Sequence, residues 1–141
     1  MPITGLNKRK IFLKYVWKLI GTWYVYGGDD PSGLDCSGLA VEALQSVGII
    51  PDKSDYTADG LWRKFQNQTV SKPVPGCLVF YGTSDRASHV EIYLGDGVNI
   101  GASGGGANIK TAEDAKGANA FIKPRPTQRM KNILGYIDPF K

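Results

Sequence analysis

Cys36 is the residue of this chain best placed to act as a nucleophile. It follows a glycine-rich stretch and precedes apolar residues at helical spacing, so we expect it at the first turn of a helix. The positive end of the helix dipole favours a thiolate there, and the thiolate is the nucleophilic form of cysteine. From position alone, a small buried structural cysteine is an equally good interpretation.

His89 is the single histidine of the 141 residues, so any chemistry that needs an imidazole depends on it. It opens an apolar run from His89 to Leu94, and the fold would have to bring it to Cys36 as a general base. Without Cys36, a strand-end histidine bonded to a neighbour would be the better interpretation. A single histidine excludes a zinc site with two histidines, and no motif predicts a metal ion or another cofactor.

Helical periodicity predicts the elements that would position Cys36. We expect helices over residues 7–20, 36–47 and 58–66, with a loop over 21–35 before the second. Gly21 and Gly48 are expected to end the first two helices, and Thr57 to cap the third.

The pattern changes to short β-rich runs after Pro73 and Pro75. A tight hairpin is expected at residues 95–97 and a turn at 104–106. Helices first and an antiparallel sheet second predict an α+β fold in a single domain, residues 1–141. Whether residues 107–141 complete the sheet or cover a groove stays open. The expected strands are Cys77–Tyr81, His89–Leu94, Val98–Ala102, Ala120–Lys123 and Ile133–Ile137.

Composition excludes several classes of protein. Hydrophobic residues make up 42% and charged residues 21%, as in globular domains, and no apolar run approaches a membrane span. The net charge is +4, with basic residues concentrated near both ends and an acidic middle. This distribution does not resemble a nucleic-acid stripe, so we expect neither a nucleic-acid partner nor membrane insertion. If both ends folded onto one basic face, that face would suit nucleic acid, a membrane surface or a bacterial wall, but a solvated surface is the better interpretation of these charges.

Three segments together resemble one known family. They are Tyr24–Leu39, with the run Gly-Leu-Asp-Cys-Ser-Gly-Leu, then Pro75–Tyr81, then Ser88–Gly97. In this order they are similar to the nucleophile segment, first strand and histidine strand of the NlpC family of peptidoglycan cysteine peptidases. The resemblance implies a papain-like α+β fold, with N-terminal helices packed on a C-terminal antiparallel sheet, in a phage-type single-domain member.

The resemblance also implies roles for individual residues. Cys36 would attack an amide carbonyl, and His89 would act as base and then as acid for the leaving amine. Tyr24 matches the family tyrosine whose hydroxyl lies near the nucleophile. Asp35 and Ser37 match positions associated with substrate binding, although Asp35 is equally well interpreted as a helix N-cap.

The chain departs from the family at the third catalytic position. The family usually has a polar residue, commonly histidine, on the strand after the catalytic histidine, and Gly101 stands there. If Gly101 lies opposite His89, then Glu91 and Asn99 face each other one pair along the hairpin. We therefore predict that Glu91 or Asn99, or else a backbone carbonyl, orients His89. Cys77 replaces a common acidic residue and is interpreted as structural.

The resulting hypothesis is a cysteine endopeptidase that cleaves the stem peptide of peptidoglycan, at the bond between D-glutamate and the diamino residue. One alternative is a non-catalytic wall-binding or phage tail module of the same fold, and another is a cysteine amidase or acyltransferase acting elsewhere. No secretory signal is recognisable at the start. We therefore expect delivery to the bacterial wall by a phage, through a holin or within the virion, or by a secretion machine.

Overall fold

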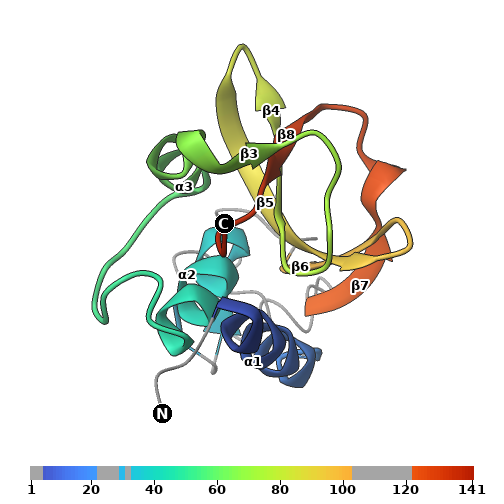
Figure 1. Cartoon of the computed structure of the whole chain (residues 1–141). Coiled ribbons are helices and arrows are strands. Elements are labelled where there is room, and N and C mark those ends of the chain that lie inside the picture. The colour runs from blue at the N-terminus through green and yellow to red at the C-terminus, as the bar shows by residue number, and fades with distance from the viewer. Residues whose placement is uncertain (1–4, 22–28, 31–32, 103–121) are drawn as a thin grey trace.

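The computed structural model describes residues 5–21, 29–30, 33–102 and 122–141 (Figure 1). Its helices are α1 (Gly5–Lys18), α2 (Cys36–Ser46) and α3 (Ala58–Lys64). Each ends one or two residues earlier than the periodicity predicts. The expected stop at Gly21 has φ +90, and Gly48, after the C-cap of α2, has φ +73, where glycine carries no steric cost.

The sheet has six strands in the order β3-β8-β4-β5-β6-β7, and all neighbours are antiparallel. The C-terminal segment therefore completes the sheet. A two-stranded ribbon, which the sequence does not predict, precedes α2 with β1 (Asp29–Asp30) and β2 (Gly33–Leu34). The six strands are β3 (Thr69–Val70), β4 (Leu78–Thr83), β5 (Arg86–Gly95), β6 (Val98–Ala102), β7 (Ile122–Pro126) and β8 (Ile133–Ile137).

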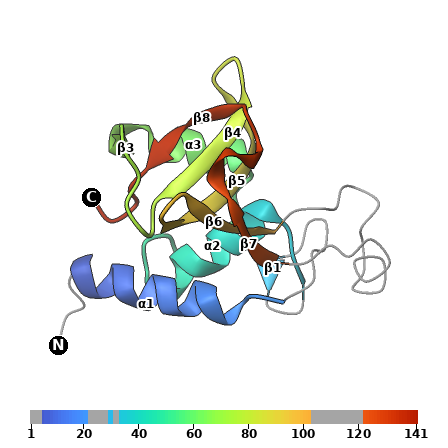
Figure 2. The ribbon, with the colours of Figure 1, turned by 90° about the vertical axis from the view of Figure 1, so that its right-hand side faces the viewer.

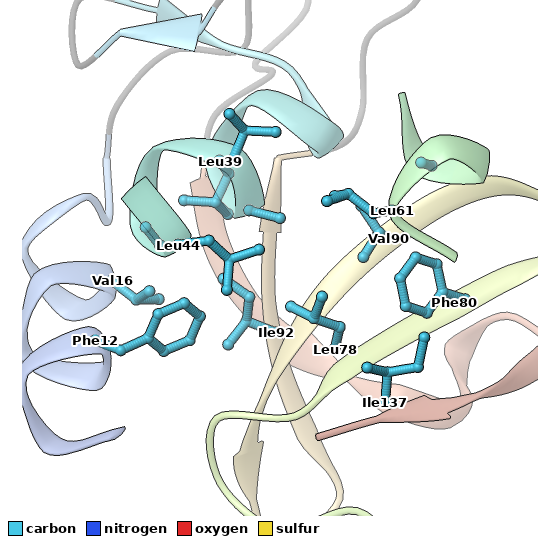
Figure 3. Packing of buried hydrophobic residues seen from close by; sticks show 14 of the residues in the cluster. Phe12, Val16, Leu39, Leu44, Leu61, Leu78, Phe80, Val90, Ile92 and Ile137 are labelled. Atoms are coloured by element: carbon cyan, nitrogen blue, oxygen red, sulfur yellow. The ribbon is translucent and has the colours of Figure 1, made fainter. Parts of the chain in front are cut away.

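The helices cover one face of this sheet, and α2 lies between α1 and the strands (Figure 2). Alternate residues of β4 and β5 belong to the core shared with the helices, and the intervening residues of β4 are buried as well. The α+β prediction of N-terminal helices on an antiparallel sheet is confirmed. The shared core, drawn in Figure 3, includes Phe12, Val16, Leu39, Leu44, Leu61, Leu78, Phe80, Val90, Ile92 and Ile137.

The β5–β6 hairpin has a different register from the one assumed in the sequence analysis. Gly95 pairs with Val98 across a turn in which both central residues have positive φ, and a bulge then sets Tyr93 opposite Asn99. Continuing this register places Gly101 beside Glu91, not opposite His89. The assumed pairing of Glu91 with Asn99 is therefore wrong, because the turn closes two residues further along β5.

Gly82 lies at a second bulge, where β4 turns toward the segment of β5 that holds His89. A Cβ atom at this position would overlap the carbonyl oxygen of Arg86 and approach the Cα of Ala87 to 3.0 Å. Both obstacles are backbone, so the hairpin itself would have to move.

We predict that Gly82→Ala lowers the free energy of unfolding by about 2 kcal/mol or more, as backbone clashes and overpacking do. Urea denaturation followed by circular dichroism measures the loss. The matched control is Thr83→Ala on the exposed neighbouring position, with an expected change within about 0.5 kcal/mol. Equal stability of Gly82→Ala and the parent protein would contradict the prediction.

Candidate active site

Cys36 is the first residue of α2, and Asp35 is the N-cap of that helix. The Asp35 side chain accepts a hydrogen bond from the backbone N–H of Gly38 at 2.6 Å, which satisfies one of the unpaired donors at the helix start. The Ser37 hydroxyl donates to the same carboxylate oxygen at 3.3 Å. Asp35 therefore fixes where the helix begins and holds Cys36 in its first turn, while the substrate-binding roles of Asp35 and Ser37 stay predictions.

His89 lies on β5, and its side chain is 17% exposed. Its Nε2 atom lies 2.8 Å from Oε2 of Glu91, two residues along the same face of the strand. The Cys36 side chain interacts with the His89 ring and raises its pKa. Because Nε2 faces Glu91, Nδ1 is the nitrogen available to Cys36. Cys36 and His89, 53 positions apart in the sequence, thus lie together with Glu91 in the order cysteine, imidazole, carboxylate.

Glu91 is buried, with only 1% of its side chain exposed. Arg129, which ends the 3-10 helix η2 (Thr127–Arg129), donates from Nη1 to Oε1 at 2.8 Å and from Nη2 to Oε2 at 2.7 Å. Asn99 donates to Oε1 at 3.3 Å. The carboxylate therefore has partners on both oxygens, as a buried charge requires.

Gly101 leaves the space that the Glu91 side chain occupies. A Cβ atom at position 101 would lie 2.5 Å from Oε2 of Glu91 and 2.6 Å from its Cδ and Cγ atoms. Gly101 and Glu91 are therefore one structural feature, in which the carboxylate fills the room left by the missing side chain.

Asn99 is buried and supports Glu91, and no hydrogen bond between it and His89 is found in the described residues. Its amide also donates to the Tyr81 hydroxyl at 2.7 Å and its carbonyl accepts from the Thr127 hydroxyl at 2.7 Å. Tyr81 donates in turn to the backbone carbonyl of Thr127 at 3.0 Å. This closed network ties β4 and β6 to the turn that carries Arg129.

The ionised forms of His89 and Glu91 stabilise each other. Burial acts to lower the pKa of His89, but the hydrogen bonds to Cys36 and Glu91 outweigh it and raise that pKa to about 9. Burial acts to raise the pKa of Glu91, but the hydrogen bonds from Arg129 and His89 outweigh it and lower that pKa to about 2. At neutral pH the imidazole is thus a cation beside an ionised carboxylate.

Sequence reasoning missed Arg129 and Tyr81. The useful signal was Glu91 itself, because an ionised residue within an apolar strand needs a cation, and cations are plentiful in residues 107–141. Tyr24 and the turn at 104–106 lie outside the described residues. Cys77 is fully buried and its Sγ accepts the Val74 N–H at 3.4 Å, which suits a structural residue.

Within the part of the chain that the structure describes, no group of three or more His, Cys, Asp or Glu residues could hold a metal ion. No helix among those residues is long and apolar enough to cross a membrane. Cys36 and Cys77 are both free thiols.

The two pKa shifts predict how stability depends on pH. The Glu91 ion pairs stabilise the fold fully above pH 4.5, and this contribution is lost as the pH falls from about 4.5 to 2. The His89 contribution is complete below pH 6.5 and is lost as the pH rises from 6.5 to about 9. We predict that Glu91→Gln flattens both slopes in urea denaturation measured across these two ranges.

The control for this prediction is Asp59→Asn. Asp59 pairs with Arg63 at 2.7 Å on the surface of α3, and that hydrogen bond lowers its pKa. This variant should reduce only the acidic slope and leave the slope between pH 6.5 and 9 intact. Unchanged slopes in Glu91→Gln would refute the charge coupling.

Comparisons with known proteins agree with this arrangement. A model of the NlpC/P60 family matches residues 21–125. Protein P54 of Enterococcus faecium is 39% identical over 101 residues, which are 67% of this chain and 18% of P54. The probable peptidoglycan endopeptidase LytE of Bacillus subtilis (strain 168) is 32% identical over 123 residues, which are 86% of this chain and 34% of LytE. The chain thus spans about a third of LytE and less than a fifth of P54.

Solved structures give the same fold. The NlpC/p60 domain of the peptidoglycan hydrolase SagA superposes with a TM-score of 0.68 at 27% identity, covering 92% of this chain and 97% of that domain. An NlpC/P60 family protein from Bacillus cereus superposes with a TM-score of 0.74 at 20% identity, covering 94% of this chain and 40% of that one. With its helices packed on an antiparallel sheet in the papain-like manner, the chain belongs to the NlpC/P60 family.

Proposed function

We propose that this protein is a cysteine endopeptidase that hydrolyses the stem peptide of bacterial peptidoglycan. The observation that carries the proposal is that Cys36, at the start of α2, interacts with the His89 ring, while Nε2 of His89 lies 2.8 Å from Oε2 of Glu91. A nucleophile bonded to a base that a third group orients is the arrangement that nucleophilic catalysis needs.

In the first half-reaction, His89 holds the proton and Cys36 is the thiolate. The sulfur attacks the amide carbonyl carbon, and the electron pair of the C=O bond moves to oxygen. The backbone N–H of Cys36, at the positive end of α2, is suited to donate to that oxyanion. The oxyanion then collapses, the C–N bond breaks, and the His89 proton passes to the leaving amine, which leaves a thioester on Cys36.

In the second half-reaction, neutral His89 takes a proton from water as the water oxygen attacks the thioester. Collapse of this second oxyanion breaks the C–S bond, releases a carboxylic acid and restores the thiolate–imidazolium pair. Glu91 takes no proton in either step, because Arg129 holds it ionised. Its role is to fix the orientation of the ring and to stabilise the cation.

The proposed substrate class rests on the similarity of this chain to named relatives. LytE is named a probable peptidoglycan endopeptidase and SagA a peptidoglycan hydrolase. We extend that substrate class to this chain, and the family resemblance names the bond between D-glutamate and the diamino residue. Tyr24, Asp35 and Ser37 keep their predicted roles beside the nucleophile. The bacterial wall is the place of action, and delivery by a phage, a virion or a secretion machine stays a prediction from the sequence.

We predict that Cys36→Ala and His89→Ala each reduce the release of peptide fragments from purified cell walls by at least about 10³-fold. Mass spectrometry of defined muropeptides after incubation identifies the bond. The matched control is Cys77→Ala, which removes the buried thiol and should keep the wild-type cleavage pattern after correction for folded protein. Equal release by Cys36→Ala and wild type would exclude the proposed reaction, and products from amides other than stem peptides would redirect the substrate.

A basic face supports the approach to an anionic wall. Lys10, Lys14 and Lys18 are exposed on α1. We predict that binding of the inactive Cys36→Ala protein to purified walls weakens several-fold between about 50 and 500 mM salt, because exposed charges are screened over a shorter distance. Replacing these three lysines with glutamine should weaken binding at low salt and remove most of the salt dependence. Binding that salt leaves unchanged would disprove the electrostatic contribution.

A further inference from the structure

We propose that Arg129 is a positioning residue of this site: it holds Glu91 ionised and aimed at His89, and so determines the pH range over which Cys36 and His89 work together. The catalytic part of this inference rests on the proposed function. Neither the sequence motifs nor the family resemblance points to Arg129, which follows β7 near the end of the chain.

The contact between Arg129 and Glu91 has a geometry that fixes the carboxylate. The guanidinium uses two nitrogens on two carboxylate oxygens, at 2.8 and 2.7 Å, so the plane of the carboxylate cannot rotate freely. Oε2, the oxygen that meets Arg129 at 2.7 Å, is also the one 2.8 Å from Nε2 of His89. Arg129 therefore fixes the direction of the contact between Glu91 and the imidazole.

The turn that carries Arg129 is itself held in place by hydrogen bonds. The Thr127 N–H donates to the Gly97 carbonyl at 2.8 Å, and the Thr127 hydroxyl donates to Asn99. Tyr81 reaches the same turn from β4 through the Thr127 carbonyl. Because this turn is anchored to β4 and β6, Arg129 loses little conformational freedom when it binds Glu91. Its guanidinium is therefore preorganised for the two hydrogen bonds.

Glu91 leaves no room for a side chain at position 101 on the neighbouring strand. A side chain at position 101 would collide with Glu91, so Gly101 and Glu91 are structurally coupled. The carboxylate is 1% exposed, and without Arg129 burial would favour its neutral form. A neutral Glu91 could not stabilise the imidazolium of His89. Gly101, Glu91 and Arg129 thus form one unit that replaces the family's third polar side chain.

Several other titratable groups interact electrostatically with His89, Glu91 or Arg129, or with a neighbour of these residues. Cys36 of α2 contacts His89 directly, and Tyr81 of β4 lies beside it with ring centroids 5.7 Å apart. Arg125 of β7 acts on Glu91 and Arg129, and Tyr136 of β8 acts on Tyr81. None of these four groups makes the pair of hydrogen bonds that Arg129 makes to the Glu91 carboxylate.

The test follows the single imidazole of the chain by proton NMR. Because His89 is the only histidine, one imidazole signal reports its titration without assignment. In the wild type we expect a midpoint near pH 9. In Arg129→Met we expect the midpoint to fall by about one pH unit or more, a tenfold or greater loss of proton affinity, and in Arg129→Lys by an intermediate amount.

The matched control is Arg9→Met. Arg9 pairs with Asp138 at 2.8 Å and is 23% exposed against 21% for Arg129, but it lies on α1 beside the C-terminus. Its loss should lower the melting temperature and leave the His89 midpoint unchanged. Glu91→Gln and Glu91→Gln/Arg129→Met should share one midpoint, because Arg129 acts only through Glu91. The double variant also removes the unpaired buried charge, which guards against misfolding of Arg129→Met.

The pH dependence of Cys36 alkylation by iodoacetamide, with the labelled peptide identified by mass spectrometry, links this titration to reactivity. We expect the alkylation rate of Arg129→Met to fall near neutral pH, because a less basic His89 accepts the Cys36 proton less completely, and to match the wild-type rate at strongly alkaline pH, where a thiol ionises without an imidazole. A wild-type midpoint in folded Arg129→Met, or a further shift when Arg129→Met is added to Glu91→Gln, overturns the inference. Failure of wild-type protein to cleave peptidoglycan, with the midpoint shift intact, would instead overturn the proposed function.

Discussion

The arrangement of this site depends on the burial of the Glu91 carboxylate, which is almost completely shielded from water. Glu91 carries its charge in a buried position on β5, where an unpaired ion would cost several kcal/mol. Arg129 supplies the opposite charge, Asn99 a further donor, and Gly101 the space. Loss of one partner of such a pair typically costs about 3–5 kcal/mol, so the turn after β7 and the centre of the sheet depend on each other.

The same constraint explains why the C-terminal segment matters to a site whose apparent motifs lie in the middle of the chain. The core packs α2 against β5 through Leu44 and Ile92, which brings Cys36 and His89 together. Arg129 then arrives from η2, just before β8 enters the sheet between β3 and β4. The segment between β7 and β8 must therefore be in place for the charge of Glu91 to be paired.

Much of this arrangement follows from local sequence. The caps Asp35 and Thr57, the changes of hydrophobic period and the glycines at helix ends predict the three helices to within a few residues, because these features act over one turn. The two-residue strands β1, β2 and β3 escaped detection because they are too short to show a period of two. The hairpin register was misjudged because a bulge and a turn with positive φ set it, which composition does not reveal.

At the site, sequence could nominate Cys36, His89 and Glu91 but could not find Arg129, because a salt bridge spanning 38 residues leaves no periodic trace. Chemistry explains why such a partner has to exist. A neutral third residue on the next strand would orient an imidazole without any counter-ion. A glutamate two positions along the same strand reaches the same ring from the same face, since strand side chains alternate. Glutamate also brings a negative charge, so a glutamate in place of the neutral third residue requires a cation. In this chain the cation is Arg129, at the end of η2 before β8.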